Sequence, residues 1–182
     1  QEGSIVYSGC IPLGGSSITS DIAIGLQVSL EEAEKIKVNM NKLFDSKYDG
    51  SKPKEIKNIP TILRKAEPEK PKKKKEEELD LNAIGIDKVV SKNMLEKIVG
   101  ARCEEIFQMA KENISKAGYD IAMPAGVVLT GGTSLLRDIT KFTQSLVGVA
   151  ARVGYPSGLT GMTEEISDPS YACVQGLIKH AM

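Results

Sequence analysis

The sequence is poor in aromatic residues and carries no net charge. Aromatic residues make up 4% of the 182 residues, and tryptophan is absent. Lysine plus arginine and aspartate plus glutamate number 24 each, so the formal net charge at pH 7 is zero. A balanced charge gives no overall attraction to nucleic acids or anionic membranes. We therefore predict no nucleic-acid partner, and attraction to a membrane surface would need a local charged patch.

Cysteine and histidine are too sparse for several kinds of functional site. The three cysteines, Cys10, Cys103 and Cys173, lie far apart without C-x-x-C spacing. This pattern argues against a disulfide framework and a zinc site, and it favours a reducing compartment. The single histidine, His180, argues against a Ser/His/Asp relay or a multi-histidine metal site. No apolar run approaches the roughly 20 residues that a membrane-spanning helix needs.

The remaining composition is that of a compact protein, and the apolar pattern alternates between helix and strand. Hydrophobic residues are 41% and charged residues 26% of the chain, which is ordinary globular usage. The predicted helices cover about residues 18–26, 30–41, 91–117, 135–146 and 169–182, and the predicted strands about residues 5–13, 125–130 and 149–153. Ser16 or Ser17 should cap the first helix, Ser29 the second, and Gly118 should end the third. This alternation predicts α/β layers with parallel strands at the core.

Residues 44–88 differ from the rest of the chain in composition. They contain three spaced prolines and a charged run, residues 69–78, in which lysines are followed by glutamates. Such a run is typical of a solvated, flexible loop, which we place at about residues 65–80. A basic docking patch is the alternative, although the acidic block partly cancels its charge. Short strands at residues 59–63 and 84–86 would flank the loop.

A glycine-rich turn is the first of two motifs that point to chemistry. The predicted strand at residues 125–130 runs into Gly131, Gly132, Thr133 and Ser134. Two glycines there allow close approach of the backbone to a bound group, and the start of the following helix offers free amide donors. A strand-Gly-Gly-helix turn is also a common packing device, and that interpretation stays open.

An acidic and a basic residue on one helix form the second motif. Glu34 and Lys37 are three residues apart, so they share a face of the predicted helix at residues 30–41. A carboxylate there can accept hydrogen bonds from ribose hydroxyls, and the lysine stem can lie along a purine. The alternative is a solvent-facing ion pair worth roughly 0.3–0.5 kcal/mol.

In this order, with an insertion between them, the two motifs resemble those of the actin-like ATPase superfamily. Residues 128–134 are similar to its adenosine motif, and residues 33–37 are similar to its adenine-side helix. Within the superfamily, the chain most resembles the FtsA family of bacterial cell-division proteins. The stretches that carry this resemblance are residues 11–15, 18–26, 152–156, 158–162, 168–172 and 176–177.

The resemblance implies one lobe of an actin-like (ribonuclease H-like) fold. Such a lobe is α/β, with a mixed, mostly parallel sheet flanked by helices. Residues 1–40 and 119–182 would form the core subdomain, and residues 41–118 a smaller, inserted α+β subdomain. The chain begins with Gln1 and lacks the glycine-rich, aspartate-bearing hairpins that hold phosphates in this superfamily. We therefore expect a processed product or a piece of a larger protein.

The resemblance also implies a cofactor, ATP with Mg²⁺. The nucleoside half of the ATP site would be formed by Glu34, Lys37, Gly131, Gly132 and Thr133, with Ser134 as a weaker candidate. The metal ligands are expected outside this chain, and no catalytic residue is expected within it. The whole protein would then have at most slow ATPase activity, and this chain alone would be inactive.

FtsZ is the implied partner. In the FtsA family the inserted subdomain receives the C-terminal tail of FtsZ, and Arg102 stands in the place of the family's docking arginine. Its planar fork suits an acidic peptide, whereas an ion pair with Glu105 is the alternative for this side chain.

The implied cellular role is cytoskeletal. The whole protein would bind ATP, self-associate into filaments and tether FtsZ filaments during division. It would act in the cytoplasm at the inner face of the membrane, through a C-terminal helix outside this chain. A DnaK-like or sugar-kinase-like ATPase lobe and a pilus-assembly actin homologue are the alternatives.

Overall fold

The computed structural model describes residues 5–44, 77–118, 123, 125–158 and 166–181. Its α-helices are α1 (Gly15–Leu26), α2 (Leu30–Val38), α3 (Met40–Phe44), α4 (Lys92–Lys116), α5 (Ile139–Val147) and α6 (Ala172–Ala181). Its 3₁₀ helices are η1 (Leu81–Ile84), η2 (Gly132–Leu135) and η3 (Pro169–Tyr171). Its strands are β1 (Glu78–Asp80), β2 (Val89–Ser91), β3 (Val127–Leu129) and β4 (Ala151–Val153).

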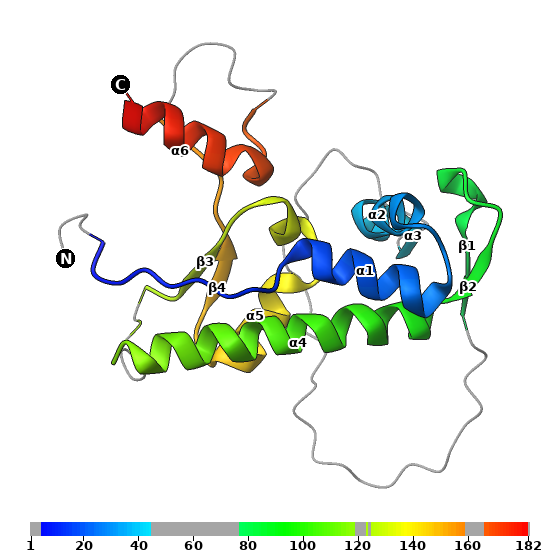
Figure 1. Cartoon of the computed structure of the whole chain (residues 1–182), viewed down its shortest axis with the longest axis horizontal. Coiled ribbons are helices and arrows are strands. Elements are labelled where there is room, and N and C mark those ends of the chain that lie inside the picture. The colour runs from blue at the N-terminus through cyan, green and yellow to red at the C-terminus, as the bar shows by residue number, and fades with distance from the viewer. Residues whose placement is uncertain (1–4, 45–76, 119–122, 124, 159–165, 182) are drawn as a thin grey trace, which may run out of the picture.

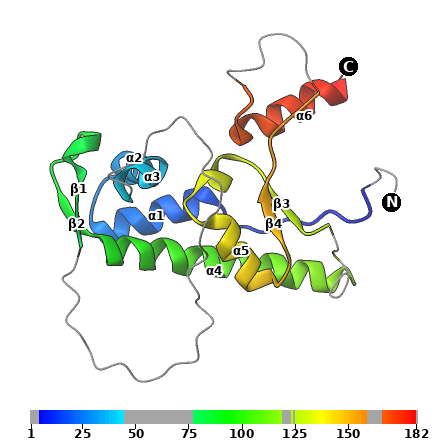
Figure 2. The same ribbon diagram turned by 180° about the vertical axis from the view of Figure 1, so that it is seen from behind.

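Helix α1 lies between α2 on one side and α4 on the other. In Figure 1, α4 runs along most of the molecule, the β1–β2 pair lies at one end of it, and α6 stands apart at the top. Figure 2 shows from behind that α5 packs against another part of α4, with the β3–β4 pair beside α5. The fully buried side chains of Ile18, Ile36 and Leu95 place α1, α2 and α4 in one hydrophobic core.

The same core joins all three predicted parts of the chain. Ile18 comes from residues 1–40, Leu95 from residues 41–118, and Ile139 from residues 119–182. The division into a core and an inserted subdomain therefore stays a prediction.

Two small sheets take the place of the larger sheet that was expected. Strands β3 and β4 are parallel, with Val128 opposite Arg152, which confirms the parallel pairing. Strands β1 and β2 are antiparallel, with Leu79 opposite Val90. Within the described ranges each sheet has two strands, so this part of the chain is mixed α and β with little sheet.

Polar side chains determine where the helices begin and end. Ser29 caps α2 as predicted: its hydroxyl accepts from the Glu32 amide at 3.2 Å, while the Glu32 carboxylate accepts from the Ser29 amide at 2.8 Å. Ser91 caps α4, and Gly118 follows the end of that helix with φ 80°, a conformation that favours glycine. The prediction that Ser16 or Ser17 caps α1 is wrong, because the N-cap residue is Gly14. Ser17 lies within the first turn, and its hydroxyl accepts a hydrogen bond from the Gly14 amide at 3.4 Å.

The predicted helix at residues 30–41 is interrupted. Helix α2 ends at Val38, and α3 begins at Met40. The Asn39 side chain donates to the Lys35 carbonyl at 2.8 Å, beside the Asn39 amide at 3.0 Å, and the Asn39 backbone leaves helical geometry at φ −93° and ψ 8°. The last predicted helix does begin at Pro169, as η3 continuing into α6.

Three further expectations about strands and loops need correction. Residues 5–13 form no strand in the described structure, since nothing pairs with them, and Ile5 is 86% exposed. Residues 84–86 are not a strand, because η1 ends there and Gly85 turns the chain at φ 77°. The predicted loop at residues 65–80 is in part strand β1, while its residues 65–76, like the predicted strand at residues 59–63, lie outside the described residues.

The three cysteines, Cys10, Cys103 and Cys173, are free thiols. Of the helices that the structure describes, none combines the length and the apolar character needed to cross a membrane.

Candidate functional site

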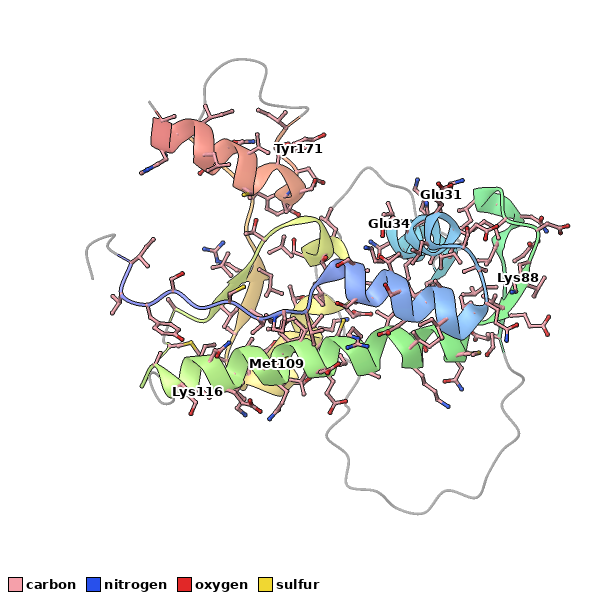
Figure 3. The ribbon with its side chains drawn as sticks, in the orientation of Figure 1. Glu31, Glu34, Lys88, Met109, Lys116 and Tyr171 are labelled. Atoms are coloured by element: carbon pink, nitrogen blue, oxygen red, sulfur yellow. The ribbon has the colours of Figure 1, made fainter. Side chains whose placement is uncertain are left out.

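Glu34 and Lys37 form an ion pair on α2. Lys37 Nζ lies 2.7 Å from Glu34 Oε2, and the lysine side chain is only 11% exposed while the glutamate side chain is 49% exposed. Figure 3 labels Glu34 on this helix. The pair is therefore unlike an ordinary surface pair, because its cation is covered and its carboxylate remains accessible.

Thr19 on α1 joins both members of this pair, although the sequence interpretation did not include it. Its hydroxyl lies 2.5 Å from Glu34 Oε2 and accepts from Lys37 Nζ at 2.8 Å. Lys37 Nζ also donates to the Gly15 carbonyl at 3.1 Å. A threonine on the apolar face of α1, next to the buried Ile18, was the signal available in the sequence. We call Thr19, Glu34 and Lys37 the threonine cluster.

The cluster keeps Glu34 ionised. Burial pushes the pKa of Glu34 upward, but hydrogen bonds from Lys37 and Thr19, together with the charge of Lys37, outweigh it and hold the pKa below its ordinary value of 4.5. Glu34 is therefore a hydrogen-bond acceptor at neutral pH. The Lys37 ammonium is directed to the first turn of α1, so its predicted position along a purine stays a prediction.

The glycine turn after β3 is held by its own hydrogen bonds. Gly131 has φ 89° and donates its amide to the Pro169 carbonyl at 3.0 Å. Ser134 is buried, and its hydroxyl donates to the Gly131 carbonyl at 2.7 Å, which gives this weaker candidate a role in the turn itself. Gly132 lies next to Ser170 of η3.

The helix after this turn starts later than predicted. Residues 132–135 form η2, and α5 begins at Ile139 rather than at residue 135. Asp138 precedes it in the left-handed conformation, φ 55°, which separates η2 from α5. The Ser134 amide already bonds to the Gly131 carbonyl at 3.0 Å, so the turn has fewer free amides than a regular helix start.

Thr133 brings the glycine turn to the threonine cluster. Its Oγ1 occupies the space that a Cβ on Gly15 would take, and Lys37 Nζ lies 3.6 Å from the same point. Gly15 is thus the place where α1, α2 and η2 meet. The structure brings together Glu34, Lys37 and Thr133, which lie far apart in the sequence.

An open depression borders this meeting point. Its volume is about 600 Å³, and its lining residues are Ser16, Thr19, Ser20, Leu30, Glu31, Glu34 and Lys35. The depression offers hydroxyls, the ionised Glu34 acceptor, the Lys35 ammonium and one apolar side chain. These hydrogen-bonding groups suit the hydroxyl-rich part of a ligand.

Arg102 lies on the other side of α1. Its Nε and Nη2 bind both oxygens of Asp21 at 2.5 and 2.9 Å, and its Nη1 binds Glu105 Oε2 at 2.5 Å. Its pKa is raised, first by the hydrogen bond with Asp21 and against the effect of burial. The alternative pairing with Glu105 is therefore present, together with a stronger two-point contact that the sequence interpretation missed. We call Asp21, Arg102 and Glu105 the arginine cluster.

Comparisons with known proteins agree on one family. The family model described as "Cell division protein FtsA" matches residues 1–176. Proteins named cell division protein FtsA are similar to this chain: 26% identity over 181 residues in Pseudomonas aeruginosa, 30% over 177 residues in Borreliella burgdorferi and 29% over 183 residues in Bacillus subtilis. These alignments cover 100%, 97% and 100% of this chain but 38%, 38% and 34% of the relatives. The chain thus spans less than two fifths of the length of these relatives.

Proposed function

Because this chain belongs to the FtsA family of cell division proteins, we propose that it carries the nucleoside half of an ATP site. The family implies an actin-like fold and a role in cell division. That membership takes precedence over a chaperone, sugar-kinase or pilus-assembly relative. The position of the site within the chain is argued from its own residues.

The convergence of Glu34, Lys37 and Thr133 at Gly15 carries the proposal. Glu34 is ionised and 49% exposed, so it can accept from ribose hydroxyls, which are donors as well as acceptors. Lys37 supplies a positive charge close by, and the turn formed by Gly131 and Gly132 brings Thr133 to the same place. ATP would bind with Mg²⁺, and we propose no metal ligand and no catalytic residue in this chain.

At the level of the whole protein, we propose self-association into filaments and tethering of FtsZ at the division site. The nucleotide would act by binding one arrangement of the lobes better than another, which shifts their equilibrium. At most slow ATP hydrolysis would accompany this. Arg102 would bind the acidic FtsZ tail. The peptide would then compete with Asp21 and Glu105 for the guanidinium group of Arg102.

An ATP titration followed by NMR of the ¹⁵N-labelled chain tests the nucleoside site. We expect weak binding, in the upper micromolar to millimolar range (about −4 to −6 kcal/mol). Lys37→Ala should weaken it by about tenfold or more, because a charged hydrogen bond contributes about 1.5–3 kcal/mol. The same titration should show no ATP turnover.

Lys141→Ala is the matched control. Lys141 forms the same kind of pair, three residues from Asp138 with Nζ and Oδ1 2.6 Å apart, but its side chain is 69% exposed and away from Gly15. ATP affinity should be unchanged in this variant. Equal affinity in the unmodified chain and in Lys37→Ala would refute the site.

The FtsZ contact is tested separately. A labelled peptide with the sequence of an FtsZ tail should bind the chain, and Arg102→Glu should abolish binding through charge reversal. Absence of binding with either form of the chain would count against the docking proposal while leaving the nucleoside site untouched.

A further inference from the structure

We infer, building on the proposed nucleoside site, that Thr19 is the positioning residue of that site. In this role Thr19 holds the Glu34 carboxylate and the Lys37 ammonium in the orientation that a ribose requires. Neither of these two charged residues would keep that orientation through α2 alone.

The hydroxyl of Thr19 has the bonding capacity for this role. It is buried, with 6% of the residue exposed, and it lies 2.5 Å from Glu34 Oε2, 2.8 Å from Lys37 Nζ and 3.1 Å from the Gly15 carbonyl. A hydroxyl has one proton and two acceptor lone pairs. The ammonium donates to it, and its own proton is best used on the carboxylate, because that contact is shorter and charge-assisted.

Fixing one carboxylate oxygen fixes the other. Thr19 and Lys37 both bind Oε2 of Glu34, and the carboxyl group is planar, so its rotation is restrained as a whole. The Glu34 side chain nevertheless stays 49% exposed. A restrained but accessible carboxylate is a better acceptor for a ligand hydroxyl, since less freedom is lost on binding.

Thr19 also connects the carboxylate to the glycine turn. Lys37 bonds both Thr19 and the Gly15 carbonyl, and Gly15 is where Thr133 packs. Without the hydroxyl, Lys37 would keep its bonds to the Gly15 carbonyl and to Glu34, whereas Glu34 would lose its own bond to α1. Thr19 is therefore the side chain that ties the Glu34 carboxylate to α1, close to the point where Thr133 of η2 packs.

Thr19→Val and Thr19→Ser separate this role from packing. Valine keeps the shape and removes the hydroxyl, whereas serine keeps the hydroxyl and loses a methyl group. Thr143→Val is the matched control: Thr143 is fully buried on α5, and its hydroxyl donates to the carbonyl four residues earlier at 2.7 Å. Thr19 likewise places its hydroxyl near the carbonyl four residues earlier, that of Gly15. Thr143 therefore shares this local geometry but has no charged pair beside it.

The measurement compares ATP with 2′,3′-dideoxyATP, which lacks both ribose hydroxyls, by NMR titration of each variant. Thr19→Val should weaken ATP binding by about tenfold and leave dideoxyATP binding unchanged. Thr19→Ser should retain most of the ATP affinity, and Thr143→Val all of it. The NMR-measured pKa of Glu34 should rise in Thr19→Val, because one of the bonds that lowers it is gone.

Failure of this inference is distinguishable from failure of the proposed function. Undiminished ATP binding in Thr19→Val, with weaker binding in Lys37→Ala, overturns the role of Thr19 and leaves the nucleoside site standing. Equal loss of ATP and dideoxyATP binding without rescue by serine also overturns it, since only packing would be involved. If Thr19→Val does not fold, the same two nucleotides are compared in Thr19→Ala. Undiminished ATP affinity in Lys37→Ala refutes the site and the inference together.

Discussion

The two sides of α1 carry charged clusters that differ in which of their hydrogen-bonding groups remain open to solvent. Thr19 faces α2 and Asp21 faces α4, as expected for residues two apart on a helix with about 3.6 residues per turn. In the threonine cluster the carboxylate of Glu34 remains 49% exposed. In the arginine cluster three nitrogens of Arg102 are bound, and its side chain is 24% exposed.

The two candidate sites can be ranked by whether the group that each ligand needs is still open to solvent. Ribose hydroxyls need a carboxylate and an acidic peptide needs the guanidinium, so the exposure of Glu105, 52%, does not help the peptide. The threonine cluster meets this condition through Glu34, whereas Arg102 would first have to release Asp21 or Glu105. The nucleoside proposal therefore needs no rearrangement, and the peptide proposal does.

The largest effect should come from Gly15→Ala, which tests the close approach at the threonine cluster. The added Cβ would overlap Thr133 Oγ1, so the Thr133 side chain or η2 itself must shift. We expect the free energy of unfolding to fall by about 1–3 kcal/mol, and ATP affinity to fall with it. Urea unfolding and NMR titration measure the two quantities.

Gly14→Ala is the control for that change. A Cβ at Gly14 would meet no atom within 4 Å, and its φ of −165° is extended backbone that any residue adopts. Its cost should be limited to a less favourable helix cap, about 1 kcal/mol or less. Equal stability and equal ATP affinity in the two variants would show that the approach of Thr133 to Gly15 is unimportant.

A smaller effect is expected from Asp21→Asn, which breaks the arginine cluster. It removes a charge from the two-point contact with Arg102, so stability should fall, but by less than in Gly15→Ala because the pair is partly exposed. ATP affinity should stay the same, since the change lies on the other side of α1. Affinity for an acidic peptide should rise if Arg102 is its docking residue.

Asp138→Asn is the matched control for this variant. Asp138 also pairs with basic side chains, and its left-handed backbone suits asparagine. Loss of ATP affinity in Asp21→Asn but not in Asp138→Asn would show that the two sides of α1 are coupled. It would contradict the expectation that the arginine cluster does not affect the nucleoside site.

The smallest effect should be a pH dependence that comes from Glu34. Because the folded pKa lies below the ordinary value of 4.5, ionised Glu34 contributes stability above that value, and this contribution is lost as the pH falls through the folded pKa. The stability difference between the unmodified chain and Glu34→Gln should therefore shrink as the pH falls below 4.5 and through the folded pKa. Urea midpoints of both proteins across this range measure it, and a constant difference would contradict the ionised cluster.

Much of the local structure could be predicted from the sequence. Ser29 was found as the cap of α2 and Gly118 as the end of α4, because such signals depend on residues only a few positions away. The helix break at Asn39 and the late start of α5 after Asp138 could not be found, since apolar spacing continues through both positions while the side chain or backbone of one residue interrupts the helix.

The candidate site was predicted in part, and the reason is similar. Glu34, Lys37 and the glycine turn stand out as motifs within a few residues of sequence. Thr19 does not, because a threonine in a helix is ordinary until its partners are known. Its bond to Glu34 spans 15 residues of sequence, a separation that no local pattern encodes.

The family, the charge balance, most helix positions and the motif residues can be recognised without a structure. The tertiary structure decided which polar groups meet: Thr19 with Glu34 and Lys37, Thr133 with Gly15, and Asp21 with Arg102. The physical reason is that the two faces of α1 are covered by helices from different parts of the chain. Only the packing of α2 and α4 against α1 determines which side chains on those faces meet a partner.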